Sequence, residues 1–293
     1  MKVFVTGATG FVGSAVVDEL IAAGHKVLGL SRNLEKGEAL GRQGAEVLHG
    51  QLEDHVLLVE AAASCDATIH CGFSHDFTRF AESCANEGKL VAALGKAYYG
   101  TKKPILLTSG VGMMRDTVTE IMAVQTDGAN PRKITEMMAE ELIAQGVDVR
   151  IIRLPIVHGD NDHGFLALLI NIAKEKGFVG YAGEGINNWP GVHRLDAARV
   201  YRLALDKGTF GSRYHPVAEE GIAYRDVATV MAARLGQKVR GLQGDEIVAY
   251  FTWFSAFAQM DRRASSAITQ KALGWIPSEI GMIEDLRTSS SYF

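Results

Sequence analysis

The opening stretch of the chain joins a short apolar run to three evenly spaced glycines and then to a helical pattern. Residues 3–5, Val-Phe-Val, are too few for a helix and predict a buried strand. Gly7, Gly10 and Gly13 follow at three-residue spacing. Glycine permits a tight turn and a close approach of the backbone to a pyrophosphate, and free N–H groups at a helix start bind phosphates. The stretch therefore predicts a dinucleotide-binding phosphate loop rather than a plain tight turn.

Composition indicates an ordinary globular protein around this loop. The 293 residues are 47% apolar and 22% charged, which is enough for a sizeable core. A net charge of -4 without basic clusters gives no footprint for nucleic acid, and no apolar run is long enough to span a bilayer. No signal peptide pattern opens the chain, and Cys65, Cys71 and Cys84 lack metal-ligand spacing. We therefore expect a cytoplasmic protein that binds a small molecule and no metal.

Strand and helix patterns alternate through the first half of the chain. Strands are expected at residues 25–31, 45–49, 67–73, 104–110 and 147–154, with helical stretches between them. This alternation predicts an α/β fold, a Rossmann-type doubly wound parallel sheet with ligands at the carboxyl ends of its strands. After residue 160 the pattern changes to helices with short strands. We expect a dinucleotide-binding domain over 1–159 and a smaller substrate lobe over 160–293, with some segments returning to the sheet.

The residue at the end of the second expected strand indicates whether the fold binds NAD or NADP. A fold that binds NAD normally has Asp or Glu here for the ribose 2′-hydroxyl, whereas Arg accommodates a 2′-phosphate. Arg32 therefore predicts NADP, unless it merely faces solvent. His70, inside the fourth strand, is expected to be a core histidine rather than a ligand. The residues expected to contact the cofactor at the strand ends and in the loop are Gly7, Thr9, Gly10, Phe11, Val12, Gly13, Ser31, Arg32, Cys71, Gly72, Phe73 and Pro155.

The chain resembles the atypical short-chain dehydrogenases/reductases, in the branch labelled NAD(P)-dependent epimerase/dehydratase. The matching stretches are residues 6–13, 71–77, 153–155 with 157–159, Trp189 with 192–196, and 273–275, so the resemblance extends along nearly the whole chain. It implies that Gln51 and Leu52 stand where the family has an Asp-Leu pair beside the adenine.

The resemblance also implies a catalytic site, from which this chain departs. In the family a Ser orients the substrate carbonyl, a Tyr transfers the proton, and a Lys lowers the pKa of the Tyr. Ser109 stands at the Ser position, but Arg132 and Glu136 stand at the Tyr and Lys positions. The departure weighs against ordinary alcohol oxidation rather than against the fold. His158 follows the sixth strand and suits proton transfer at neutral pH, so we expect it, or a bound water, to supply the proton.

These assignments predict an NADP(H)-dependent reductase of a small carbonyl, imine or activated double bond, with Ser109, His158 and Arg132 as its catalytic residues. Two alternatives follow from the missing Tyr and Lys: a non-catalytic NADP-binding sensor, and an epimerase or dehydratase that retains its cofactor. The apolar stripe of Met137, Met138 and Leu142 is compatible with a homodimer, although such a stripe is first of all core. No nucleic acid or membrane partner is expected.

Overall fold

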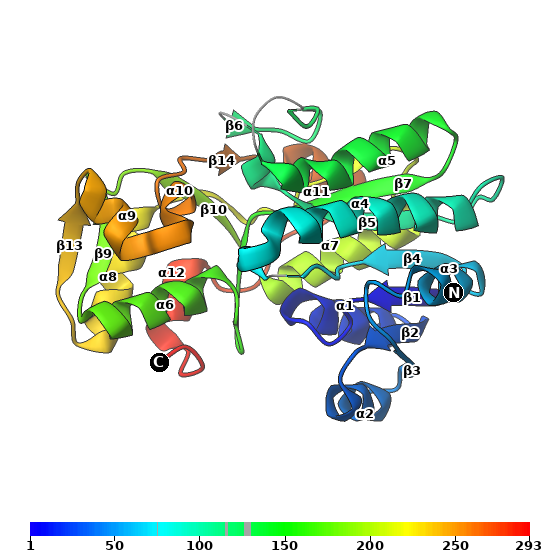
Figure 1. Ribbon diagram of the computed structural model, residues 1–293, viewed down its shortest axis with the longest axis horizontal. Coiled ribbons are helices and arrows are strands. Elements are labelled where there is room, and N and C mark those ends of the chain that lie inside the picture. Colours follow the sequence, from blue (N-terminus) through cyan, green and yellow to red (C-terminus); the bar gives the residue numbers. More distant parts are fainter. Residues whose placement is uncertain (75, 115–116, 126–129) are drawn as a thin grey trace.

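The structure is a computed structural model that describes residues 1–74, 76–114, 117–125 and 130–293 (Figure 1). His75, within the stretch 71–77, lies outside the described residues. The ribbon has two parts, with the N-terminal strands and their helices in one and most of the C-terminal helices in the other.

A seven-stranded sheet forms the first part, and its strand order is β11-β7-β5-β4-β1-β2-β3. Every neighbouring pair runs parallel. The strands are β1 (Lys2–Thr6), β2 (Lys26–Ser31), β3 (Glu46–His49), β4 (Ala67–His70), β5 (Ile105–Gly110), β7 (Val149–Leu154) and β11 (Arg213–Tyr214). This order, with β1 and β4 at the point where the chain changes direction, confirms the predicted Rossmann-type fold.

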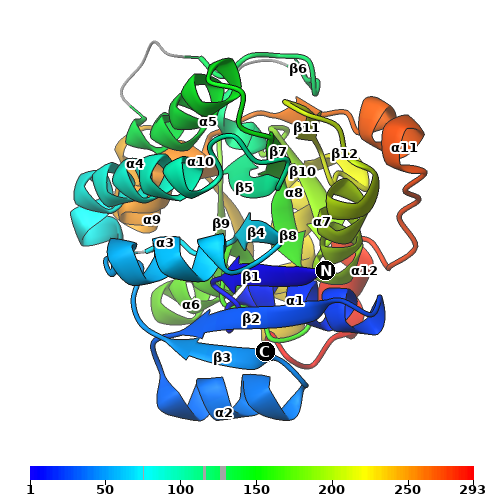
Figure 2. The ribbon, with the colours of Figure 1, turned by 90° about the vertical axis from the view of Figure 1, so that its right-hand side faces the viewer.

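Helices cover both faces of this sheet because alternate strand residues are apolar on both sides. In β1, Val3 and Val5 pack in the core under α1 (Phe11–Ala22) and α7 (Arg194–Lys207). Phe4 points the other way, into the core under α3 (His55–Ala63), α4 (Phe80–Ala97) and α5 (Ile134–Ala144). Figure 2 shows α3, α4 and α5 on one side of the sheet and α7 on the other. The shorter α2 (Leu34–Arg42) lies against β3.

The second part has its own apolar core, in which Trp189 packs on Tyr224 with ring centroids 4.4 Å apart. Its strands are β8 (Ile156–His158), β9 (Val179–Ala182), β10 (Asn188–His193), β12 (Glu219–Ala223) and β13 (Val239–Leu242). Its helices are α6 (Phe165–Lys176), α8 (Tyr224–Leu235), α9 (Asp245–Phe251), η4 (Thr252–Phe254), α10 (Ser255–Ala258) and α12 (Met282–Thr288). We call this part the lobe; α7 and β11 follow residue 159 in sequence yet pack with the seven-stranded sheet.

The remaining elements are short. They are η1 (Phe77–Arg79), η2 (Val111–Met113), η3 (Pro131–Lys133), the pair β6 (Thr117–Val118) and β14 (Arg263–Ala264), and α11 (Ala267–Leu273). Among the described residues, no helix is both long and apolar enough to cross a membrane. Cys65, Cys71 and Cys84 carry free thiols. The expected cytoplasmic location stays a prediction.

Candidate cofactor and catalytic site

The glycines of the phosphate loop are required by the packing between β1, α1 and the chain after β4. Gly7 has φ +66°, and its carbonyl accepts the Gly10 N–H at 2.9 Å, which closes the turn. A Cβ on Gly7 would lie 2.7 Å from the Gly72 nitrogen, and one on Gly13 would lie 2.0 Å from the Gly7 oxygen. Gly10 is the N-cap of α1, so the first N–H groups of the helix have no helical partner. This cradle of bare backbone at a helix start fits a pyrophosphate.

Thr9 lies in the turn, and Phe11 and Val12 open α1, each half-buried beside this cradle. The Phe11 ring contacts the loop that leads into lobe helix α6, because the His163 ring lies 5.7 Å from it edge-on. The guanidinium of Arg194, the first residue of α7, lies 5.4 Å from the Phe11 ring centroid. The phosphate loop is therefore the place where the sheet and the lobe meet.

Ser31 and Arg32 differ in what they contact. Ser31 is buried, and its hydroxyl donates to the Asn33 carbonyl at 2.7 Å, which shapes the turn into α2. Arg32 is exposed, and it makes no ion pair or hydrogen bond with any other residue that the structure describes. A guanidinium that is free of carboxylates is suited to a 2′-phosphate.

The two residues expected beside the adenine follow β3. Gln51 is exposed, and its backbone N–H donates to the Asp54 carboxylate at 2.8 Å. Leu52 is half-buried and packs on the turn after β4, since a Cβ on Gly72 would lie 2.8 Å from its Cδ2. The Leu52 side chain therefore borders the turn after β4 that packs on the phosphate loop.

The fourth expected strand ends earlier than the sequence predicts, at His70, because the next residues cross over the turn at Gly7. Burial raises the pKa of the Cys71 thiol to about 11, beside Thr108 and Tyr201, so the thiol stays protonated at neutral pH. Pro155 is buried between β7 and β8.

Arg132 lies at the carboxyl ends of β4 and β5, held on several sides. Its guanidinium carbon lies 4.0 Å from the centroid of the Phe73 ring, and its Nη1 donates to Glu87 Oε1 at 3.1 Å. Its Nη2 lies 3.4 Å from the Thr108 carbonyl oxygen. Burial alone would raise the pKa of Glu87, but His70 and Arg132 outweigh it and lower the pKa to about 2. The pair is therefore ionised at neutral pH, and Arg132 can bind an oxygen but cannot give up a proton.

Glu136 is the centre of a second buried cluster, in which it binds Ser109 and Arg153. The Ser109 hydroxyl donates to Glu136 Oε1 at 2.6 Å. Arg153, next to Ser109 in the register of β5 and β7, donates to both oxygens of Glu136, at 3.0 and 2.6 Å. All three side chains are buried. Because the carboxylate engages the hydroxyl here, the assignment of Ser109 to the substrate carbonyl stays a prediction.

His158 lies in the lobe, apart from these pairs. It is fully buried on β8, with its Nδ1 2.8 Å from Asp285 Oδ2. The same oxygen accepts the Tyr292 hydroxyl at 2.7 Å, and that hydroxyl accepts the Gly159 N–H at 2.8 Å. Among the described residues, His158 makes no hydrogen bond to Arg132 or Ser109. Its assignment as the proton donor stays a prediction.

The structure thus gathers Arg132 and Ser109 at neighbouring strand ends, with Glu87 and Arg153 as their buried partners. The family resemblance implies that Glu87 stands where the superfamily often has Asn and this branch has Asp, whereas no role in the site was assigned to Arg153 from the sequence. Glu87 stands on the buried face of α4, and Arg153 is a fully buried cation on β7. A charged residue at a core position is rarely left unpaired, so each one signals a buried partner. The pattern alone could not identify that partner, because it comes from another element.

Comparisons with known proteins agree with this architecture. The sequence profile of the NAD dependent epimerase/dehydratase family matches residues 3–217. The chain is 41% identical over 297 residues to "Uncharacterized protein C2A9.02" of Schizosaccharomyces pombe, covering 100% of both chains. It is 24% identical over 258 residues, 81% of this chain and 74% of the other, to 4-hydroxy-2-methyl-3-oxo-4-farnesyl-3,4-dihydroquinoline-1-oxide ketoreductase of Stigmatella aurantiaca.

Among solved structures, the dTDP-glucose 4,6-dehydratase DesIV from Streptomyces venezuelae, with NAD and TYD bound, has the same fold. Its TM-score is 0.78 at 20% identity, over 98% of this chain and 95% of that chain. The family profile covers well over half of the residues, and its matched span includes the phosphate loop, Arg132 and Ser109. The resemblance seen in the sequence is confirmed, and the chain belongs to the NAD dependent epimerase/dehydratase family.

Proposed function

We propose that this protein is an NADP(H)-dependent reductase of a small carbonyl, imine or activated double bond. The observation that carries the proposal is the Arg132 guanidinium, fixed by Glu87 over the Phe73 ring at the carboxyl ends of β4 and β5. In a doubly wound sheet this edge is where the ligand binds. The ketoreductase among the relatives supports reduction of a carbonyl.

The charge balance of this site favours a neutral acceptor. Glu87 already compensates the charge of Arg132, so a permanently anionic substrate would gain little there. A carbonyl oxygen gains negative charge only as hydride arrives, and a preorganised donor is most effective against charge that develops in the transition state. Bound NADPH would supply the hydride, and the phosphate loop would hold it. Arg132 orients the acceptor oxygen, and we assign the proton to a bound water or to His158.

The choice of NADP is supported by Arg32, whose guanidinium is exposed at the end of β2 and free of described partners. Replacing it with alanine should raise the Kd of NADPH by about 10- to 100-fold, because hydrogen bonds to charged groups contribute about 1.5–3 kcal/mol. The Kd of NADH should not change. Fluorescence titration with each dinucleotide measures both constants.

The matched control is Arg42→Ala, which removes an exposed arginine from the last turn of α2, the helix that follows Arg32. It should leave both constants unchanged. Equal losses of NADPH and NADH affinity in Arg32→Ala would show that this residue does not read the 2′-phosphate.

The reaction itself is tested by following nicotinamide absorbance with NADPH and a panel of aldehydes, quinones and enones. Turnover of one class identifies the acceptor. The alternative of an NADP-binding sensor is favoured by the engaged Ser109 hydroxyl, and it predicts tight NADPH binding with no turnover across the panel. A cofactor-retaining epimerase or dehydratase would instead be purified with its nicotinamide bound.

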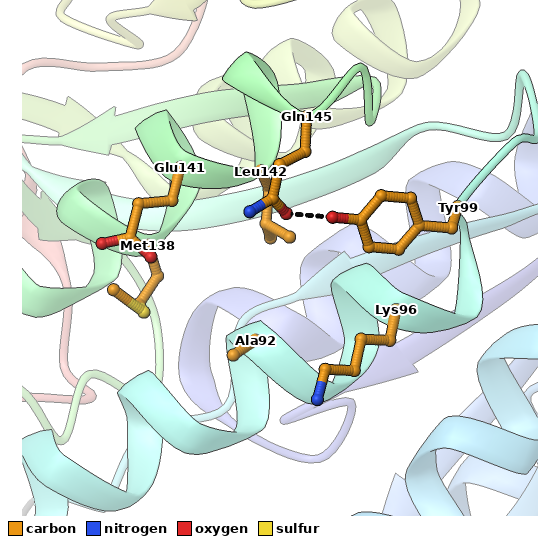
Figure 3. Close-up of a pocket in the computed structure, with 7 residues that line it drawn as sticks. All are labelled: Ala92, Lys96, Tyr99, Met138, Glu141, Leu142 and Gln145. Atoms are coloured by element: carbon orange, nitrogen blue, oxygen red, sulfur yellow. Dashed lines mark hydrogen bonds between the residues drawn. The ribbon is translucent and has the colours of Figure 1, made fainter.

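We also propose that the protein forms a homodimer through the outer faces of α4 and α5. A hollow of about 230 Å³ lies between these helices, lined by Ala92, Lys96, Tyr99, Met138, Glu141, Leu142 and Gln145 (Figure 3). Tyr99 and Gln145 point toward one another across its end and share a hydrogen bond. Apolar side chains with one cation and one anion at the edge suit a self-complementary interface.

A further inference from the structure

We propose that His70 is the positioning residue of this site: it holds the Arg132 guanidinium through Glu87 and ties it to the phosphate loop through Thr6. The inference rests on the proposed function, because it explains how a cofactor at the loop and an acceptor at Arg132 would be placed relative to one another. It also gives a role to a histidine that the sequence pattern assigns only to the core.

The contacts form one continuous chain across the site. The Gly72 N–H donates to Thr6 Oγ1 at 3.2 Å, and that oxygen lies 2.6 Å from His70 Nδ1. On the other side of the ring, His70 Nε2 lies 3.0 Å from Glu87 Oε2. Glu87 Oε1 then accepts Arg132 Nη1 at 3.1 Å. Five residues on four elements are thereby linked without a gap.

The hydrogens can be assigned along this chain. Ionised Glu87 can only accept, so His70 must donate to it from Nε2. His70 Nδ1 then accepts the Thr6 hydroxyl hydrogen, and Thr6 in turn accepts the Gly72 N–H. Every donor therefore points from the phosphate loop toward Glu87. Only an imidazole, with one donor and one acceptor on opposite sides of the ring, completes this pattern.

Burial makes the arrangement rigid. Thr6 is 0%, His70 1% and Glu87 3% exposed, so water cannot replace a lost partner. Thr135 adds a further bond to Glu87 Oε1 at 3.2 Å from the start of α5. A buried network with every member satisfied fixes a single geometry, whereas a partly satisfied one is costly.

At one end of this series of hydrogen bonds, the position of Thr6 is coupled to that of the phosphate loop. Thr6 directly precedes Gly7, whose backbone packs against Gly72 so closely that a Cβ on Gly7 would lie 2.7 Å from the Gly72 nitrogen. A phosphate that orders this turn therefore also orders Thr6 and His70. The opposite end, Arg132, belongs to η3 at the entry to α5. Occupancy of the loop should reach residues 131–136 through His70.

Hydrogen–deuterium exchange of the full chain tests this coupling. The probe is 2′-phosphoadenosine 5′-diphosphate, which carries the phosphates of NADPH but lacks the nicotinamide half that would reach Arg132 directly. In the unmodified chain we expect the probe to slow exchange at residues 6–13 and also at 131–136. In His70→Leu we expect protection at 6–13 alone, with a Kd for the probe raised about fivefold or more.

Thr68→Val is the matched control. Thr68 lies two residues before His70 on the same strand face, is fully buried, and bonds to the Tyr98 hydroxyl at 2.7 Å. The Thr68→Val variant should show protection at both 6–13 and 131–136, and its Kd for the probe should equal that of the unmodified chain. If His70→Leu fails to fold, Glu87→Gln interrupts the same series of hydrogen bonds at the residue next to His70. This variant should also lose protection at 131–136 while keeping it at 6–13.

The outcomes separate the two proposals. Protection at 131–136 that survives in both His70→Leu and Glu87→Gln, or that is absent from the unmodified chain while the probe is bound, overturns the coupling and leaves the proposed cofactor intact. An unmodified chain that does not bind the probe overturns the proposed cofactor, and the coupling with it.

Discussion

At the scale of single residues, the site is built from compensated charges. Arg132 and Glu136, which the resemblance implies stand at the Tyr and Lys positions of the family, each have a buried partner of opposite charge. Glu87 pairs with Arg132, and Arg153 pairs with Glu136. A buried ion stripped of its partner costs several kcal/mol, so neither member of a pair can change alone without a large penalty.

Glu87 should make stability sensitive to acid. Its pKa is lowered from the ordinary 4.5 to about 2 in the fold, so its ionised form stabilises the native state above pH 4.5. This contribution is lost as the pH falls from 4.5 toward 2. The free energy of unfolding should therefore fall more steeply over that window in the unmodified chain than in Glu87→Gln. Urea denaturation at a series of pH values measures both slopes.

The control is Glu175→Gln, at a side chain that is 76% exposed on α6. Its slope should follow that of the unmodified chain. Parallel slopes for Glu87→Gln and the unmodified chain would mean that the fold does not lower the pKa of Glu87.

At the scale of elements, the phosphate loop shows how closely β1, α1 and the turn after β4 must pack. Gly13→Ala would put a methyl group 2.0 Å from the Gly7 oxygen, which is backbone and cannot rotate away. Helix α1 must then move off β1. We expect a loss of about 1–3 kcal/mol in stability and the loss of NADPH binding, seen by thermal unfolding and by titration.

Gly41→Ala separates this clash from the general effect of the substitution. Gly41 lies in α2, where an added Cβ would meet only Val47 Cγ2, at 3.7 Å. There the change should stabilise the helix by about 0.5–1 kcal/mol and leave NADPH binding unchanged. A Gly13→Ala protein that binds NADPH normally would show that the close approach of α1 is not needed.

The elements that position the cofactor could be predicted from the sequence because their signals are local. Glycine spacing, a short apolar run and a helical repeat lie within residues 3–22, and β1 and α1 occupy that stretch. The lobe was harder, since β10 pairs with β8 and β12, which lie far from it along the chain. The hydrogen-bonded series Thr6–His70–Glu87–Arg132 is harder still to predict from sequence. Its members come from β1, β4, α4 and η3, and only the tertiary fold brings them together.

At the scale of the whole molecule, segments from the end of the chain are buried in both parts. Trp275 is buried in the sheet core and its indole N–H donates to the Asp196 carbonyl at 3.1 Å. Tyr292 is buried in the lobe core, where its hydroxyl joins the Gly159 backbone, directly after β8, to Asp285. Helices α4 and α5, where we propose that a second copy binds, lie on the far side of the sheet from α7.

The proposed dimer on that surface predicts a clear change in mass. Ala92 lines the hollow between α4 and α5, so Ala92→Arg would bury an uncompensated cation at the centre of the interface. Such a charge costs several kcal/mol, enough to dissociate a dimer at micromolar concentration. Light scattering after gel filtration should give twice the chain mass for the unmodified protein and one chain mass for Ala92→Arg. Ile268→Arg, at a residue 44% exposed on α11, should remain dimeric; an unmodified protein of one chain mass would contradict the dimer.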